Sequence, residues 1–157
     1  MVQNSRVKFG VDAMLGNLAR YLRILGYDTL YWKEYTDAEI LEELSKNDRI
    51  LITRDKQLYF KAIDKGINVV FFTEPLPINK LLSCLREVGL IDLSFDPKKS
   101  RCPECNGELM ETNKPPMSYG NHARKYFVCK RCGMIYWVGK HFHYIMKTLG
   151  EAKNESC

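Results

Sequence analysis

The stretch Arg49-Ile50-Leu51-Ile52-Thr53-Arg54-Asp55 decides the fold, because it places an apolar run between charged residues. A short strand with apolar residues on both faces is typical of a parallel sheet that helices cover on both sides. Val69-Val70-Phe71-Phe72 forms a second run of this kind. Asp55 follows the first run directly, so we expect its carboxylate at the carboxyl end of a buried strand.

Strand-like and helical segments alternate around these two runs. Alternating apolar and polar residues predict a strand over 6–12, and residues 28–32 are short and β-prone. Apolar residues recur at helical spacing in 14–25, 37–44, 55–65 and 79–88, and a glycine follows three of these segments. The repeated strand–helix order favours a three-layer α/β/α domain with a parallel sheet. Right-handed crossovers favour the strand order 2-1-3-4, in which strands one and three end side by side at a ligand-binding switch point.

Charge divides the chain of 157 residues into two parts. Residues 1–97 carry 13 Lys and Arg against 14 Asp and Glu, a net charge of −1, whereas residues 98–157 carry 11 against 5, a net of +6. We therefore predict an α/β domain over 1–97 and a basic module over 98–157. Phosphate backbones are the usual partner of such a basic module. The alternative is that its lysines only keep a small module soluble.

The sequence predicts no membrane partner. No run of eighteen apolar residues occurs, and the first residues lack the apolar core and cleavage site of a signal peptide. We therefore expect a soluble, cytoplasmic protein.

Four of the six cysteines form two C-x-x-C pairs, Cys102-Pro-Glu-Cys105 and Cys129-Lys-Arg-Cys132, with 23 residues between the pairs. Two intervening residues let a tight turn direct both sulfurs at one cation, and two such turns complete a tetrahedron of thiolates. The pattern predicts a small β-rich zinc ribbon over residues 98–140, with a short helix over 143–149 after it. An iron–sulfur centre or redox dithiols are the alternatives. Four thiolates leave no open coordination position, so the zinc would be structural.

The two other cysteines predict no metal site. Cys84 lies in an apolar helical pattern and is expected to be a small buried hydrophobe. Cys157 is expected to be an exposed thiol without a role.

Three acids stand where an open α/β sheet places its chemistry. Asp12 ends the first predicted strand, Asp55 follows the third, and Asp37 opens the second predicted helix. Carboxylates gathered at one place repel one another unless a divalent cation lies among them, and Mg²⁺ or Mn²⁺ suits oxygen ligands. Arg54 and Lys56 flank Asp55 and could hold a phosphate. The alternative is that the acids only cap helices, which suits Asp55 and Asp37 in particular.

Motifs run in order along nearly the whole chain: Phe9-x-x-Asp12-x-Met14-Leu15-Gly16-x-Leu18-Ala19-Arg20-x-Leu22-Arg23-x-Leu25-Gly26, Asp37-x-x-Ile40, Arg49-Ile50-Leu51-x-Thr53-Arg54-Asp55, and the ribbon Cys102 to His141 with Tyr136-Trp137-x-Gly139-x-His141. Together they resemble the Mut7-C RNase family. The resemblance implies a PIN-like nuclease domain with a C-terminal zinc ribbon, in which acids bind Mg²⁺ or Mn²⁺ and cut RNA.

The resemblance also implies roles for single residues. Asp12, Asp37 and Asp55 match the acids of the family, and Arg20 and Arg54 match its basic positions. No motif names the fourth acid that PIN-like sites often use. Asp64, Asp92 and Asp96 are candidates, and the last two are favoured because they follow the fourth strand. We expect no small-molecule cofactor besides the metals.

Aromatic and basic residues interleave in the ribbon, as suits single-stranded RNA, whose bases stack while its phosphates meet cations. Arg124 and Lys125 are the predicted substrate-binding pair. Half of the rings are expected to form only the small core of the ribbon. Arg20 and Arg23 lie opposite the apolar helix face, where a solvated arginine is the default. The set comprises Tyr119, His122, Tyr126, Phe127, Tyr136, Trp137 and Phe142 with Arg124, Lys125, Arg131 and Lys140.

A metal-dependent ribonuclease is the function that the sequence favours. The alternative is a non-catalytic RNA-binding or adaptor protein, which shares the basic ribbon and differs in the affinity of its acids for divalent ions. A phosphoacceptor domain also has an Asp after its third strand, but it needs paired acids after the first strand, and these are not present. Endonuclease and exonuclease action both stay open.

Overall fold

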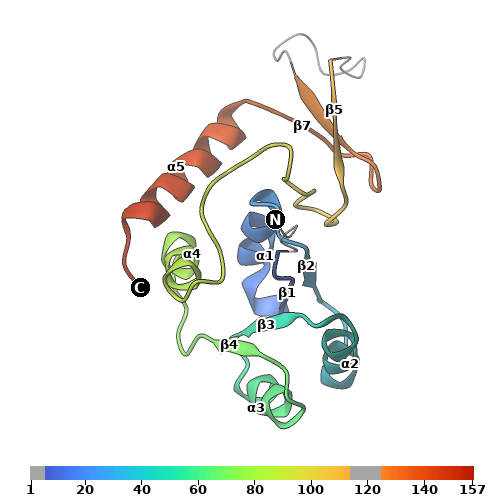
Figure 1. Cartoon of the computed structure of the whole chain (residues 1–157), viewed down its shortest axis with the longest axis vertical. Helices are drawn as coiled ribbons and strands as arrows, with labels where there is room; N and C mark the ends of the chain where they lie inside the picture. Colours follow the sequence, from blue (N-terminus) through green and yellow to red (C-terminus); the bar gives the residue numbers. More distant parts are fainter. Residues whose placement is uncertain (1–5, 114–124) are drawn as a thin grey trace, which may run out of the picture.

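The computed structural model describes residues 6–113 and 125–157 and shows two sheets (Figure 1). The first is a four-stranded parallel sheet in the order β2-β1-β3-β4, which confirms the predicted order 2-1-3-4. The second is a three-stranded antiparallel sheet in the order β5-β6-β7. The architecture is therefore the predicted α/β domain followed by a small β-rich module.

The strands and helices begin and end within a few residues of their predicted positions. The α/β part contains β1 (Phe9–Val11), the 3₁₀ turn η1 (Ala13–Leu15), α1 (Gly16–Ile24), β2 (Thr29–Tyr31), α2 (Asp37–Asn47), β3 (Ile50–Thr53), α3 (Lys56–Asp64), β4 (Val69–Phe71) and α4 (Ile78–Glu87). The second part contains β5 (Leu109–Thr112), β6 (Tyr126–Cys129), β7 (Ile135–Trp137) and α5 (Lys140–Asn154). The largest difference is α5, which is longer at both ends than the predicted helix 143–149.

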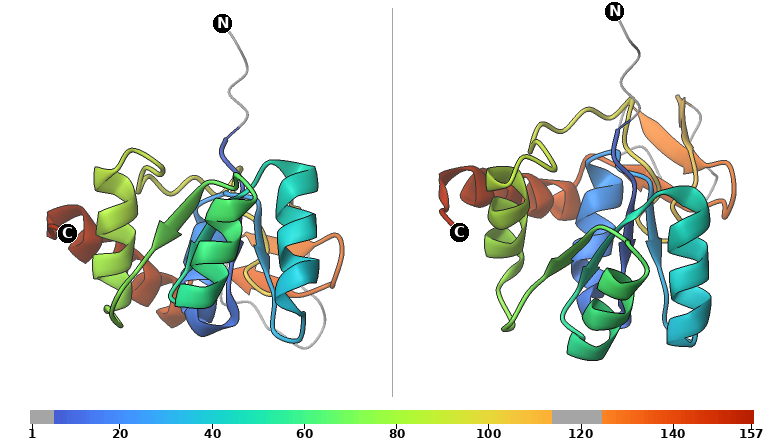
Figure 2. Two further views of the ribbon diagram at one scale, coloured as in Figure 1. Left: turned by 90° about the horizontal axis from the view of Figure 1, so that it is seen from below. Right: turned by 60° about the horizontal axis from the view of Figure 1, so that its bottom comes forward.

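Helices cover both faces of the parallel sheet (Figure 2). Phe9, Val11 and Ile52 belong to a core with α1 and α4, whereas Leu51 belongs to a second core with α2 and α3. Successive residues of β3 thus enter different cores, because side chains alternate across a strand. This explains why the sequence of β3 is continuously apolar, and it confirms the three-layer arrangement.

Gly10 lets the second core approach the sheet closely. A β-carbon at this position would lie 2.3 Å from the ring of Trp32 and 2.6 Å from Leu44. Only glycine leaves room for the indole over the middle of β1.

The helix α5 returns to the first part of the chain. Leu149 and Ala152 are fully buried in the same core as Phe9 and α1, and Ile145 and Met146 pack against that core. Figure 1 shows α5 beside α4. The division at residues 97 and 98 stays a proposal, and the core of the α/β part includes residues from beyond it.

Cys84 is buried in the apolar core as predicted, but the prediction that Cys157 carries a free thiol was wrong, because the two cysteines form a disulfide bond. They are 73 residues apart in sequence, and the folding of α5 against α4 brings their α-carbons to 4.6 Å. Polar contacts hold the same segment: Lys80 and Asn79 donate to the carboxylate of Glu155, at 3.1 and 3.2 Å. Each cysteine was interpreted alone because no local spacing links them.

Candidate functional site

Asp12 joins the carboxyl ends of β1 and β3. Its side chain is buried, with 5% of its surface exposed. Oδ1 accepts a hydrogen bond from the backbone N of Met14 (2.8 Å), and this bond caps the amino end of η1. Oδ2 accepts from the backbone N of Arg54 (3.0 Å) and from the hydroxyl of Thr53. The protein therefore holds this carboxylate in one orientation.

The side chain of Thr53 links Asp55 to Asp12 by hydrogen bonds. The Thr53 hydroxyl donates to Asp12 and accepts from the backbone N of Asp55 at 2.9 Å. Oδ1 of Asp55 caps α3 by accepting from the backbone N of Gln57 (2.9 Å) and Leu58 (3.2 Å). Helix capping, the alternative reading of Asp55, is thus present in the structure, and it uses one of the two carboxylate oxygens.

Asp37 lies apart from this pair. It is the first residue of α2, and its Oδ2 forms an ion pair with Nζ of Lys61 on α3 at 3.0 Å. Thr36 and Glu39 form the capping box of α2, so the helix does not depend on Asp37 for its cap. Asp37 therefore faces α3 rather than Asp12.

The three carboxylates do not gather at one point. Within residues 6–113 and 125–157, one group of three or more Cys, His, Asp or Glu has all its ligand atoms within 4.8 Å of one another, and that group consists of cysteines. Asp12 and Asp55 share Thr53, but Asp37 is not brought to them. The shared hydroxyl thus places the backbone of Asp55 next to the Asp12 carboxylate, while Asp37 is paired with Lys61.

The predicted fourth acid Asp92 lies elsewhere. Its backbone N donates to the hydroxyl of Tyr27 (2.9 Å), and its carboxylate is 3.8 Å from Arg6. Both partners precede parallel strands, so Asp92 is at the amino edge of the sheet, opposite Asp12. The preference for Asp92 was wrong, because following β4 in sequence does not return the chain to the carboxyl edge.

The two basic residues around Asp55 differ in their surroundings. Lys56 is exposed. Arg54 is half-buried, and its Nε is buried without a hydrogen-bond partner among the described residues. The backbone N of Arg54 donates to Asp12, so the Arg54 side chain leaves the backbone at the same carboxyl edge of the sheet.

Arg20 and Arg23 of α1 contact the first cysteine pair. Arg20 Nη1 is 2.6 Å from Oε1 of Glu104, within Cys102-Pro-Glu-Cys105. The expectation that Arg23 is solvated was wrong: it is buried, and it donates to the carbonyl oxygens of Thr29 (2.9 Å) and Pro103 (3.0 Å). Burial lowers the pKa of the Arg23 guanidinium from its ordinary value. Arg23 thus connects α1, β2 and the ribbon.

Asn106 makes a second connection between the ribbon and the sheet, which sequence reasoning missed. Its side chain accepts from the backbone N of Thr29 (3.1 Å) and donates to Oδ1 of Asp28 (2.8 Å). Asp28 also accepts from Nη1 of Arg49 at 2.9 Å. Burial raises the pKa of Asp28, but the hydrogen bonds from Arg49 and Asn106 outweigh it and leave that pKa below its usual value. In the sequence, the available signal for this junction was the position of Arg49 directly before a buried strand.

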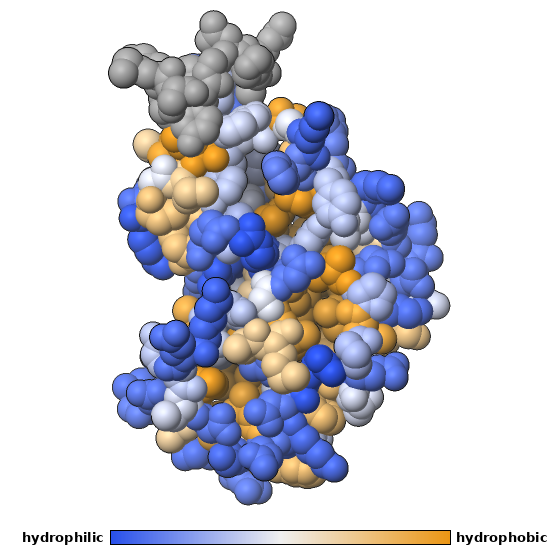
Figure 3. Space-filling model, turned by 180° about the vertical axis from the view of Figure 1, so that it is seen from behind, coloured by the Kyte–Doolittle hydropathy of each residue, from blue (hydrophilic) through white to orange (hydrophobic). Residues whose placement is uncertain are grey.

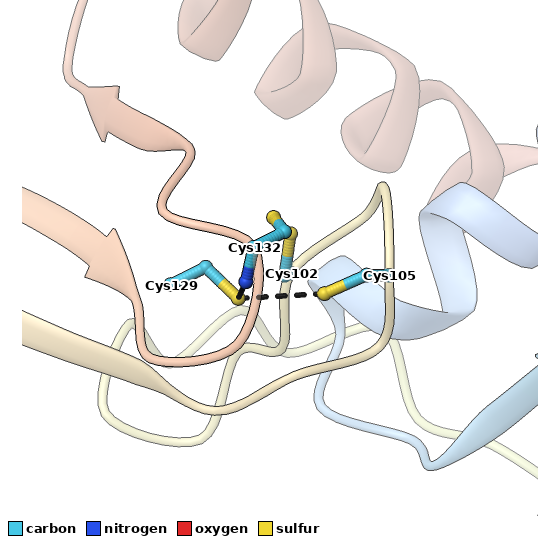
Figure 4. A group of neighbouring side chains, drawn as sticks. All are labelled: Cys102, Cys105, Cys129 and Cys132. Carbon is cyan, nitrogen blue, oxygen red and sulfur yellow. Dashed lines mark hydrogen bonds between the residues drawn. The ribbon is translucent and has the colours of Figure 1, made fainter.

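The four cysteines form one compact cluster (Figure 4). Their sulfurs lie within 4.8 Å of one another, with 3.7 Å between Cys102 and Cys132 and 3.4 Å between Cys105 and Cys129. A tetrahedral zinc site with bonds of about 2.3 Å requires sulfurs about 3.8 Å apart. The donor set and its size are therefore compatible with a structural zinc ion.

The backbone around the cluster is shaped for thiolates. Asn106 and Gly133 have the positive φ angles that such turns need, 71° and 79°. Burial raises the pKa of the Cys129 thiol, but hydrogen bonds from the backbone N of Cys132 and Arg131 outweigh it and lower that pKa to about 6. A β-carbon at Gly107 would lie 2.8 Å from the Cys129 sulfur, so glycine keeps this space open. The turn therefore favours the ionised form of Cys129, whereas the pKa values of Cys105 and Cys132 are raised by burial and by hydrogen bonds to neighbouring cysteines.

The predicted RNA-binding residues of the ribbon are only partly described. Lys125 is exposed, and its Nζ is 3.6 Å from a carboxylate oxygen of Glu111. Arg124 lies outside the described residues, as do Tyr119 and His122. Tyr126 is buried, which fits the expectation that part of the rings form the ribbon core.

Fold and site together define a class: a parallel α/β domain with acids at the carboxyl ends of β1 and β3, joined to a four-cysteine ribbon. Residues 7–149 match the model of the Mut7-C RNAse domain, and the chain belongs to this family. The match confirms the resemblance in the sequence and indicates a ribonuclease-related function. No curated protein matches the chain. In the described part of the chain, no helix is both long and apolar enough to span a membrane.

Proposed function

We propose that this chain is a Mg²⁺- or Mn²⁺-dependent ribonuclease with a PIN-like site, and that a structural zinc ion holds its ribbon. The observation that carries the proposal is the pairing of Asp12 with Asp55 through Thr53, in a chain of the Mut7-C RNAse domain family. We include RNA as the substrate and the cytoplasm as the location in the proposal.

The pair of acids offers oxygen ligands in a fixed place. A carboxylate has about four lone-pair positions, and Asp12 uses three of them. Oδ2 of Asp55 makes no hydrogen bond to the described residues. Mg²⁺ binds through one or two carboxylates and keeps several waters, so two acids are enough to hold it. When bound, such an ion would polarise a phosphoryl oxygen and make an attacking water more acidic.

The surrounding residues would position the phosphodiester. Lys56 and the amino end of α3 present positive charge beside Asp55, and both suit a phosphate oxygen. Arg54 adds a guanidinium whose Nε lacks a partner within the described residues. Asp37 would join the site only after release from Lys61, and we propose it as a supporting ligand rather than a fixed one.

Bound zinc would stabilise the fold of the ribbon. Four thiolates complete its coordination, so it offers no position to a substrate. The ribbon carries the excess positive charge of the chain, and we propose that it holds the RNA strand while the acids act on it.

One observation favours the second candidate, a non-catalytic RNA-binding protein. In the described residues the three acids are not gathered, and each already has a structural role as an acceptor or ion-pair partner. A site of this kind could hold RNA without a divalent ion.

Cleavage of end-labelled single-stranded RNA in Mn²⁺ or Mg²⁺ separates the two candidates. Wild type is compared with Asp12→Asn and Asp55→Asn, and Asp48→Asn serves as the matched control because Asp48 is exposed at the C-cap of α2, where asparagine also tolerates the positive φ. The ribonuclease is supported if EDTA and both site variants reduce the rate by about 10²-fold or more, as expected for loss of a charge-stabilising group, while the control cuts normally. RNA binding by all four proteins without metal-dependent cleavage would establish the second candidate instead.

A further inference from the structure

The ribbon exposes several of its large apolar side chains. Met110, Met134 and Val138 are 47% to 50% exposed. Figure 3 shows apolar side chains on the surface of the ribbon, at the top of the view and next to the residues drawn in grey. A module of this size gains little stability from hydrophobic burial, so its metal site and the polar contacts around that site have to supply the rest. The hydrogen bonds of the four sulfurs therefore matter for the whole ribbon.

Three of the four sulfurs have hydrogen bonds with the backbone of their own turns. The sulfur of Cys129 accepts from the backbone N of Arg131 (3.3 Å) and of Cys132 (3.4 Å). Cys105 and Cys132 each have a backbone hydrogen bond two residues further along the chain. Hydrogen bonds of this kind stabilise the negative charge of a thiolate and fix its direction. The turns themselves thus support these three sulfurs as metal ligands.

Cys102 is supported by a side chain from another strand. It is fully buried, and the hydroxyl of Tyr136, 34 residues along the chain, lies 3.0 Å from its sulfur. A sulfur that binds zinc carries no proton, whereas a phenol keeps its proton at neutral pH, so the hydroxyl would be the donor. Because a buried charge without a hydrogen-bond partner is costly, the Cys102 thiolate depends on this hydroxyl.

We propose that Tyr136 is a positioning residue of the zinc site, whose hydroxyl holds the Cys102 thiolate toward the metal and thereby ties β7 to the first cysteine pair. Cys129 ends β6 and Tyr136 is the middle residue of β7, so the two strands reach the cluster from the same sheet. The sequence suggested an RNA contact or a place in the ribbon core for this ring, and neither role requires the hydroxyl to meet a sulfur. The inference rests on the structural zinc ion of the proposed function.

Zinc affinity tests this role without any measurement of RNA cleavage. The zinc dissociation constants of the full chain, of Tyr136→Phe and of Tyr144→Phe are measured by competition with a chromophoric chelator. Tyr136→Phe removes one hydroxyl and keeps the ring. Tyr144→Phe makes the same change at a position of α5 that is 65% exposed, so it is the matched control. We expect Tyr136→Phe to bind zinc about tenfold more weakly than wild type, as is typical for loss of a partner of a metal ligand, and the control to bind like wild type.

Substitution of Co²⁺ for zinc reports on the hydrogen bond itself. Thiolates bound to Co²⁺ give a sulfur-to-metal charge-transfer band in the near ultraviolet. A hydrogen bond lowers the energy of the sulfur lone pairs, so loss of the Tyr136 hydroxyl should move this band to lower energy. The band of Tyr144→Phe should stay at the wild-type position. A role of Tyr136 in packing alone would weaken metal binding without this spectral shift.

The inference is overturned if Tyr136→Phe binds zinc as tightly as the control, or if its affinity falls while the Co²⁺ band does not move. A wild-type chain that binds no zinc would refute the proposed zinc site itself, which is a different result. If Tyr136→Phe does not fold, the wild-type chain made with 3-fluorotyrosine decides: its more acidic hydroxyl is a stronger donor and should move the band to higher energy, and an unmoved band overturns the inference. Neither readout depends on whether the protein cleaves RNA.

Discussion

The two candidate metal sites of this chain are built in opposite ways. In the ribbon, four sulfurs from two C-x-x-C turns lie within 4.8 Å of one another. At the edge of the parallel sheet, the predicted acids come from three separate elements and are engaged individually. Asp12 accepts three hydrogen bonds, Asp55 caps α3, and Asp37 pairs with Lys61.

The difference teaches how sequence spacing relates to site geometry. A C-x-x-C turn fixes the distance between its sulfurs locally, so the cluster forms wherever the two turns meet. The acids depend on where three elements end, and each is held by protein donors. On the proposed function, zinc would complete the fold of the small ribbon, whereas metal at the sheet edge would bind to a fold that the protein's own core already stabilises. The predictions that follow separate these two dependences.

Loss of one cysteine should have the largest effect. Cys129→Ser removes a ligand from the cluster, and structural zinc provides about 10–16 kcal/mol of folding free energy in isolated zinc-finger peptides. We expect the variant to lose bound zinc and the ordered β5–β7 sheet, as measured by elemental analysis and amide-proton NMR. Cys157→Ser is the control: it breaks the disulfide with Cys84 but keeps all four cluster cysteines, so zinc and the β5–β7 sheet should be retained. Retention of one zinc ion per chain by Cys129→Ser would argue against a four-thiolate site.

Replacement of Asp12 should destabilise the protein, even without metal. Asp12→Ala leaves the Thr53 hydroxyl and two backbone N–H groups without their acceptor, at a cost of about 2–4 kcal/mol. Asp37→Ala removes only an ion pair with a largely exposed lysine and should cost less than about 1 kcal/mol. Urea unfolding in EDTA measures both. Equal losses of unfolding free energy in the two variants would contradict this difference between Asp12 and Asp37.

Asp28→Asn should weaken the junction between the ribbon and the sheet in a pH-dependent way. The hydrogen bonds that Asp28 accepts from Arg49 and Asn106 should contribute about 1.5 kcal/mol to the unfolding free energy. Because the fold lowers the pKa of Asp28, this stabilisation is present above the unfolded value of about 3.9 and is lost as the pH falls through the lower folded value. The difference in unfolding free energy between wild type and variant should therefore shrink below pH 4. A difference that is constant from pH 3 to 7 would exclude this charge effect.

The smallest effect is expected from the exposed pair of Arg20 and Glu104. Both side chains are about half exposed, so Glu104→Gln should cost well below about 1 kcal/mol, and less in high salt. Unfolding midpoints at low and high NaCl concentration measure this. If Arg20 also binds RNA, as the resemblance implies, the same variant should strengthen RNA binding because it frees the guanidinium. Unchanged binding would limit Arg20 to contact with the ribbon.

Features with a local cause could be predicted from the sequence. The continuous apolar run Ile50–Ile52 indicated a strand buried on both faces, and the spacing of the cysteines indicated their cluster. The alternation of strands and helices indicated a parallel sheet, and right-handed crossovers left few arrangements, among which the order 2-1-3-4 was chosen and is confirmed.

Features that depend on distant partners could not be predicted. Arg23 is buried because Pro103, 80 residues later, supplies a carbonyl acceptor. The disulfide joins residues 73 apart, and Asp37 finds Lys61 only when α2 and α3 lie side by side. In each case, the periodicity of one segment carries no information about the segment that meets it.

The burial of α5 has a consequence for the order of events during synthesis. Leu149 and Ala152 complete the core that begins with Phe9, so the α/β part exposes an apolar surface until residues 140–154 have left the ribosome. Both cysteine pairs emerge before α5 does. The four cysteines can thus come together first, and the core of the α/β part closes only when α5 docks on elements that were made first.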